Sequence, residues 1–323
     1  MGITDFHNHL QNHLFSDDLD AVLERAQHAG VTRFVCNGTS PDDWQDVLKI
    51  AETHSCVYPC IGLHPWFVGE SKDLEGVRRS IRQLERLLGD NRRHENLCRK
   101  RPETVPAKHP TLCYQTGVGE IGLDRSLRQR NDAIQEYAFT RQLDVALERE
   151  LPVMLHSVRS ASRMWELLQD KCPKLFVLHS FAGPTDIIPA FLELGAFFSF
   201  SALLLRNKSR KVVEALQAVP MNRIVLESDS PALPPSRHFG EDGKRSGRTP
   251  CSLLRCSDET WRNEPSIIPH ILHKLSLVKK ITVEEAECQI RENEESIFAA
   301  WPKHGESPGT ICPDNPNGWL GRS

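Results

Sequence analysis

Two histidines separated by a single residue, His7 and His9, lie near the start of the 323-residue chain. On an extended strand alternate side chains point to the same face, so we expect both imidazoles to project together from the end of a first strand at residues 3–6. Such a pair offers a metal ion two nitrogen ligands. Because a chain with 14 histidines can contain an H-x-H pair by chance, the metal-binding interpretation depends on further ligands.

Four further side chains of metal-ligand type each follow a short apolar run. They are Glu120 after residues 116–118, His156 after 152–155, His179 after 175–178 and Asp229 after 224–226. Short bounded apolar runs are typical of buried parallel strands, so each run brings an imidazole or a carboxylate to a strand exit. Four imidazoles and two carboxylates would be costly to bury together without a cation. The set therefore predicts a metal centre.

Eight apolar runs, which we interpret as strands, alternate with stretches of helical periodicity. The strands are centred near residues 5, 35, 59, 119, 154, 177, 198 and 226, and the helices span residues 19–29, 44–53, 74–88, 134–147, 161–168, 187–194 and 212–218. This alternation favours parallel strands with right-handed crossovers, and eight units close an α/β fold of the (β/α)8 TIM barrel type. Active sites of such barrels lie at the carboxyl ends of the strands, where the six candidate ligands fall.

We expect one barrel domain over residues 1–301, with two long loop insertions, and a flexible tail over residues 302–323. The first insertion, at about 90–114, follows the third helix and should lie on the amino-terminal face of the barrel. The second, at 234–262, follows the eighth strand and should open over the catalytic face. It carries basic side chains that could reach a substrate: Arg237, His238, Lys244, Arg245, Arg248 and Arg255. Two further helices are predicted at residues 265–277 and 283–299.

The bulk composition is that of a soluble globular protein, with 39% hydrophobic residues and a formal net charge of -3. It provides no global basic field, so contacts to nucleic acid must be local, and no 18-residue apolar run suggests a membrane partner. The early first strand leaves no room for a signal peptide, and the ten cysteines show no disulfide or zinc pattern. We expect a cytoplasmic protein, with a nuclear location left open.

Seven short motifs follow one another along the chain. They are D-F-H-N-H-L at 5–10, G-L-H-P-W at 62–66, G-E-I-G-L-D at 119–124, L-H-S at 155–157, H-S-F-A-G at 179–183, E-S-D-S-P at 227–231 and R-N-E-P at 262–265. With these motifs the chain resembles the TatD-type metal-dependent deoxyribonucleases of the amidohydrolase superfamily, from residue 3 to about residue 300. The two insertions and the tail depart from the family pattern.

The resemblance implies a hydrolase that cuts phosphodiester bonds of a DNA substrate, as a 3′–5′ exonuclease, with a water activated by two divalent ions. By the same resemblance, His7, His9 and Asp229 would hold the first ion, His156 and His179 the second, and Glu120 would bridge the two. Zinc, manganese and magnesium are all candidate ions, because imidazoles suit the first two and the family is commonly assayed with the third.

The resemblance also implies catalytic and substrate-binding roles. Glu120, Asp229 and His64 would be catalytic, with Asp229 accepting the proton of the attacking water. His64 is expected to contact the scissile phosphate or its leaving oxygen, and Arg159 a neighbouring phosphate. Phe181 is expected to contact the substrate. Plainer interpretations stay open: His64 could be a loop histidine that packs on Trp66, and Arg159 a solvated residue at a helix start.

Two other classes of function are compatible with the residues. The same metal centre could hydrolyse an ester, amide or lactone bond in a small molecule or an aminoacyl-RNA, since it activates water equally well against a carbonyl carbon. A non-catalytic scaffold could also have kept the barrel, although retention of every proposed ligand argues against it. The sequence does not determine the natural substrate, the mode of cutting or the oligomeric state.

Overall fold

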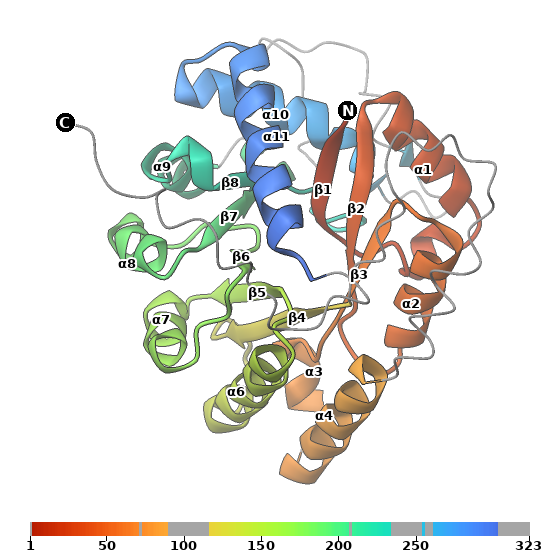
Figure 1. The fold of residues 1–323 in the computed structure, drawn as a ribbon, viewed down its shortest axis with the longest axis vertical. Helices are drawn as coiled ribbons and strands as arrows, with labels where there is room; N and C mark the ends of the chain where they lie inside the picture. Colours follow the sequence, from red (N-terminus) through yellow and green to blue (C-terminus); the bar gives the residue numbers. More distant parts are fainter. Residues whose placement is uncertain are drawn as a thin grey trace, which may run out of the picture.

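The computed structural model describes residues 2–70, 73–89, 116–206, 209–233, 254–255 and 261–302. Eight parallel strands follow one another in sheet order β1 to β8, surrounded by helices (Figure 1). The strands are β1 (Ile3–Asn8), β2 (Val31–Asn37), β3 (Val57–Ile61), β4 (Gly117–Asp124), β5 (Val153–Val158), β6 (Phe176–Leu178), β7 (Phe197–Phe200) and β8 (Ile224–Leu226). A parallel bridge between Asn8 and Ser230 joins the exits of β1 and β8. The predicted TIM barrel is thus confirmed.

Helices connect the strands at the predicted places. They are α1 (Leu19–His28), α2 (Trp44–Thr53), α3 (Pro65–Glu70), α4 (Leu74–Leu88), α6 (Asp132–Glu148), α7 (Ala161–Asp170), α8 (Ile188–Glu193), α9 (Arg210–Ala218), α10 (Ile268–Lys279) and α11 (Val283–Ala300). The structure adds α3, which is too short to show a helical period in the sequence. None of the helices in the described ranges has the length and hydropathy needed to cross a bilayer.

Most of the expected insertions and tail fall outside the described residues. This holds for 90–114, for 303–323 and for all of 234–262 except two short strands. These are β9 (Leu254–Arg255) and β10 (Trp261–Arg262), which pair in antiparallel fashion. The domain boundaries therefore stay a prediction.

Local sequence explains where several helices begin. Asp73 accepts a hydrogen bond from Gly76 N at the start of α4, and Asn131 accepts one from Ile134 N at the start of α6. At α11, Thr282 and Glu285 form a capping box, in which each side chain binds the other residue's backbone N–H. These caps satisfy backbone donors that a helix start leaves open.

The interior of the barrel is apolar below the candidate ligands. Met154 lies two residues before His156 and Val177 two before His179, so each shares a strand face with the histidine that follows it. Both belong to a buried cluster that also contains Phe298 and Trp301, at the end of α11. The carboxyl-terminal helix thus contributes to the same packed interior that supports the polar residues.

A buried carboxyl links α11 to the barrel and makes stability depend on pH. The Glu294 carboxylate accepts hydrogen bonds from Thr4 N and Thr4 Oγ1, both at 2.9 Å, and from Arg33 Nη2 at 2.9 Å. Burial raises the pKa of Glu294 to about 7 despite these bonds. Between about pH 4.5 and pH 7 the folded protein therefore keeps this proton, whereas the unfolded chain has released it. The free energy of unfolding should fall as pH rises through this range.

We expect Glu294→Gln to remove this part of the pH dependence. Between pH 5 and pH 8 the wild type should lose on the order of 3 kcal/mol more unfolding free energy than the variant. Urea denaturation at each pH, with a chelator present, measures the unfolding free energy of the wild type and of the variant. Glu295→Gln is the matched control, because Glu295 also pairs with Arg33, at 3.2 Å, but its side chain is 58% exposed. Equal pH slopes for Glu294→Gln and wild type would contradict the assignment.

Candidate metal centre

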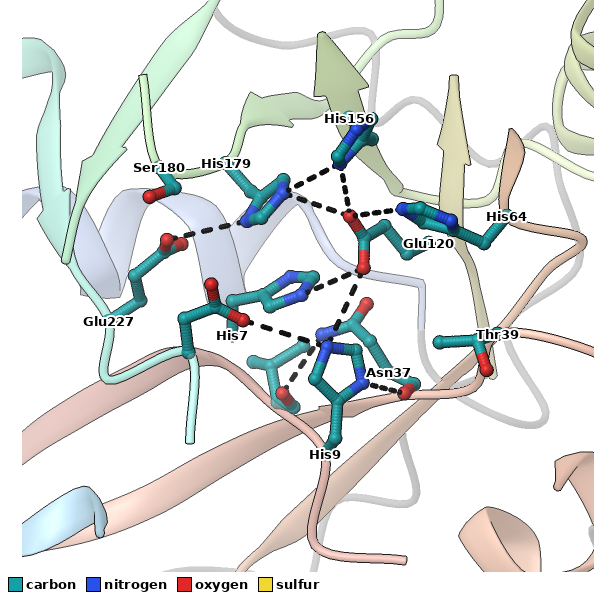
Figure 2. Close-up of polar contacts among 12 residues, drawn as sticks. His7, His9, Asn37, Thr39, His64, Glu120, His156, His179, Ser180 and Glu227 are labelled. Atoms are coloured by element: carbon teal, nitrogen blue, oxygen red, sulfur yellow. Dashed lines mark hydrogen bonds and ion pairs between the residues drawn. The ribbon is translucent and has the colours of Figure 1, made fainter. Parts of the chain in front are cut away.

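The Glu120 carboxylate lies at the centre of a ring of imidazoles, as Figure 2 shows. Its side chain comes from β4, and the imidazoles come from or just after β1, β3, β5 and β6. Oε2 lies 3.1 Å from His7 Nε2 and 3.6 Å from His9 Nε2, whereas Oε1 lies 2.7 Å from His156 Nδ1, 2.9 Å from His179 Nε2 and 3.2 Å from His64 Nε2. Each carboxylate oxygen thus faces its own set of nitrogens.

Asp229 completes the set from the exit of β8. Its Oδ1 lies 3.6 Å from His9 Nε2, and it forms a compact group of candidate ligands with His7 and His179. The Asp229 backbone has a φ of 54°, and its N–H donates to His7 O at 2.9 Å. Asn263 supports this segment by donating to Ser228 O at 2.7 Å. The structure therefore brings all six predicted ligands together, although a register shift in β1 interrupts the regular alternation on which the H-x-H argument depended.

Two of the imidazoles are oriented by acceptors on their far nitrogens. His9 Nδ1 lies 2.7 Å from Asn37 O, and His156 Nε2 lies 3.2 Å from Asp124 Oδ2. His179 Nδ1 lies 3.4 Å from Glu227 Oε1, which is an ion-pair contact without hydrogen-bond geometry. A carbonyl or carboxylate oxygen only accepts, so in the neutral rings of His9 and His156 the far nitrogen carries the proton and the near nitrogen offers its lone pair to the centre. This is the arrangement expected of metal-binding histidines.

His64 has the opposite arrangement. Its Nδ1 accepts a hydrogen bond from Trp66 N at 3.1 Å. In the neutral ring the proton is therefore on Nε2, the nitrogen that points at Glu120 Oε1. His64 thus presents an N–H donor to the centre, which suits contact with an anionic oxygen better than ligation of a cation.

The charges of the cluster show why it suits a cation. Burial alone would raise the pKa of Glu120, but the neighbouring His179, His64 and His7 outweigh it and hold that pKa well below its usual range. Burial lowers the pKa of His64 to about 4 and also lowers that of His7. Burial would lower the pKa of His9 too, yet the carboxylates of Asp229 and Glu120 raise it to about 9.

Ionised carboxylates in this buried site therefore attract protons onto the imidazole of His9. A divalent ion bound by the same nitrogens and oxygens would replace such protons, since metal ligands must be deprotonated. Four imidazoles and two carboxylates form a donor set that suits a first-row divalent metal. The residues present therefore fit the implied ions.

Two predicted substrate contacts have different positions. Arg159 follows β5 directly, is exposed and has a φ of 53°, so its role stays a prediction. Phe181 is only 3% exposed and packs edge-on against Phe198, with ring centroids 5.0 Å apart. Its apolar ring is thus part of the core, and the expectation that Phe181 contacts the substrate stays a prediction.

The sequence interpretation missed the residues that orient the ligands. Asp124 and Glu227 lie within motifs that we quoted, four residues after Glu120 and two before Asp229, so a second carboxylate at the same strand exit was a usable signal. Asn37 contributes its backbone oxygen, which no residue type reveals.

We expect Asp124→Ala to lower metal affinity or turnover by about 10- to 100-fold, because His156 would lose the partner that fixes its ring. Isothermal titration with the divalent ion and kcat measurements check this. Ser126→Ala is the control, since Ser126 binds the other Asp124 oxygen and does not touch His156. If both variants behaved alike, the orienting role of Asp124 would be disproved.

Comparison with known proteins agrees with this geometry. The family model described as TatD related DNase matches residues 4–299. The human protein named Deoxyribonuclease TATDN3 is 29% identical over 92% of this chain and 95% of its own length. A Pantoea vagans protein named 3′-5′ ssDNA/RNA exonuclease TatD is 27% identical over 88% of this chain and 94% of its own.

A solved structure shares the fold. The crystal structure of the TatD homolog YjjV from Escherichia coli K12 matches with a TM-score of 0.72 at 24% identity, and the match covers 92% of this chain and 98% of that one. The match to the family model spans nearly all of the barrel and contains all six residues of the candidate centre. The chain therefore belongs to the TatD related DNase family.

Proposed function

We propose that the protein is a metal-dependent deoxyribonuclease that hydrolyses phosphodiester bonds of DNA from the 3′ end. The observation that carries the proposal is the two-sided environment of Glu120, whose Oε2 faces His7 and His9 while Oε1 faces His156 and His179. When bound, two divalent ions would supply an acidified water as nucleophile and neutralise charge on the phosphoryl oxygens.

The side chains divide the binding of these ions between them. His7, His9 and Asp229 would hold one, His156 and His179 the other, and Glu120 would bridge them through its two oxygens. Asp229 has a further part, because its carboxylate can take the proton of the attacking water. These roles follow the family resemblance and the contacts of each residue.

His64 would act on the substrate. Its Nε2–H points into the centre and would donate to the scissile phosphate or to the leaving oxygen, either of which gains negative charge as the bond breaks. Arg159, exposed beyond β5, would pair with a neighbouring phosphate and so help to hold the strand in register.

An end-specific nuclease assay tests the proposal. With divalent metal, a 5′-labelled single-stranded oligonucleotide should shorten progressively from its 3′ end, and a 3′-terminal phosphorothioate linkage should slow the first cut. His9→Ala is the control for contaminating nuclease. RNA of the same sequence should be tested in parallel, since the Pantoea relative is named for both nucleic acids. Hydrolysis of p-nitrophenyl esters or lactones without any cleavage of DNA would instead favour a carbonyl hydrolase.

A further inference from the structure

We propose that Trp66 is the stacking platform for the nucleobase next to the phosphodiester that is cleaved. The inference rests on the proposed function and adds a residue that binds the substrate. Trp66 is 56% exposed, and in the described part of the chain Leu277 on α10 is the one other large hydrophobic side chain that is exposed. Next to a candidate active site, an exposed aromatic ring offers a large flat apolar area that a ligand can cover.

Trp66 is one side chain away from the metal centre. It lies in the first turn of α3, directly after the exit of β3. Its ring centroid is 5.1 Å from that of His64, with the rings nearly perpendicular at 86°. His64 in turn lies 3.2 Å from Glu120 Oε1 and points toward it in Figure 2. A phosphate that accepts a hydrogen bond from His64 would therefore bring its own nucleoside close to the indole.

The indole is exposed and yet fixed in position. Its Nε1–H donates to Asp124 Oδ2 at 2.8 Å, while the backbone N–H of the same residue donates to His64 Nδ1 at 3.1 Å. Asp124 is 2% exposed and also binds His156, so the anchor belongs to the buried structure of the site. A ring held in this way loses little conformational freedom when a ligand stacks on it.

A nucleobase is the ligand that these features fit. The indole N–H is already used by Asp124, so the ring offers only its apolar, π-electron faces. Every base presents a flat face of the same kind, and base–aromatic stacking tolerates any sequence. Trp66 would thus strengthen binding of a single strand without selecting its sequence, which suits an enzyme that removes successive nucleotides.

Abasic substrates test the inference directly. We compare kcat/KM for a single-stranded oligonucleotide with that for the same strand carrying a tetrahydrofuran abasic residue at each of its last three positions in turn. For the wild type, one position should cost about 5- to 150-fold. In Trp66→Ala the intact strand should be cleaved as slowly as that abasic strand, and the penalty should vanish. An unchanged penalty in Trp66→Ala would overturn the proposal.

Two variants separate stacking from positioning. Trp66→Phe keeps an aromatic face but loses the N–H bond to Asp124, so it should retain most of the abasic penalty. Leu277→Ala, which removes an equally exposed apolar side chain, should behave like the wild type. If Trp66→Phe and Trp66→Ala lost the penalty equally, the residue would act through Asp124 and stacking would be excluded.

A binding measurement distinguishes this inference from the proposed function. Fluorescence anisotropy of labelled intact and abasic strands, with chelator present, gives the ratio of the two Kd values without any cleavage. The ratio should exceed about 5 for the wild type and approach 1 for Trp66→Ala. If the wild type does not cleave DNA but its Kd ratio exceeds about 5, the proposed nuclease function is wrong and stacking stands. If the wild type cleaves DNA but its Kd ratio is near 1, stacking is wrong and the nuclease function stands.

Discussion

Glu120→Gln should lower kcat/KM for single-stranded DNA by about 10³-fold or more. The amide has nearly the same shape as the carboxylate, but it carries no charge and turns one ligand oxygen into an NH2 donor. Since both Glu120 oxygens face imidazole nitrogens, the substitution affects both candidate ion sites at once. Loss of several kcal/mol of transition-state stabilisation from the ions corresponds to such a factor.

Metal content should fall together with activity in this variant. Elemental analysis after dialysis should show less bound divalent metal in Glu120→Gln than in the wild type, while thermal unfolding of the metal-free proteins shows whether the fold is intact. Glu166→Gln is the matched control, because Glu166 lies on α7 with its side chain 52% exposed and pairs only with Arg163 among the contacts found for it. Undiminished cleavage by Glu120→Gln would show that the activity comes from a contaminant.

Asp229→Asn should lower kcat by about 10²- to 10⁴-fold, the range for loss of a general base. Asn tolerates the left-handed backbone that Asp229 adopts at φ 54°, so the segment after β8 should keep its course. The neutral amide cannot take the proton of the attacking water. The substitution should also weaken ion binding at His7 and His9 more than at His156, because His9 is the imidazole closest to the Asp229 carboxylate.

Single-turnover kinetics and metal stoichiometry test this second prediction. At saturating DNA the chemical step should slow by the stated factor, with KM changed much less than kcat. With two ions bound as proposed, the ion at His156 and His179 should remain measurable after dialysis has removed the more weakly bound one. A kcat within about twofold of the wild type would rule out Asp229 as the base and leave it only a ligand.

Sequence periodicity determined the architecture of this protein. Short continuous apolar runs marked the eight buried strands, and an apolar period of about 3.6 residues marked the helices between them. Because parallel barrel strands all exit at one end, a histidine or carboxylate after each apolar run had to reach the same rim. The convergence of His7, His9, Glu120, His156, His179 and Asp229 was for this reason predictable from their places along the chain.

Only the tertiary structure decided how each side chain is used at that rim. His9 and His64 are both histidines at strand exits, yet one has its far nitrogen against a carbonyl oxygen and the other against a backbone N–H. As neutral rings they therefore present different groups to the centre, a lone pair from His9 and an N–H from His64. Phe181 lies in a motif beside His179 and is nonetheless buried, whereas Trp66 lies beside His64 and is exposed. The sequence pattern shows that a residue lies at a strand exit. How deeply its side chain is buried and which atoms it contacts depend on residues such as Asn37 and Asp124, which other strands contribute. That information arises only when the chain is folded.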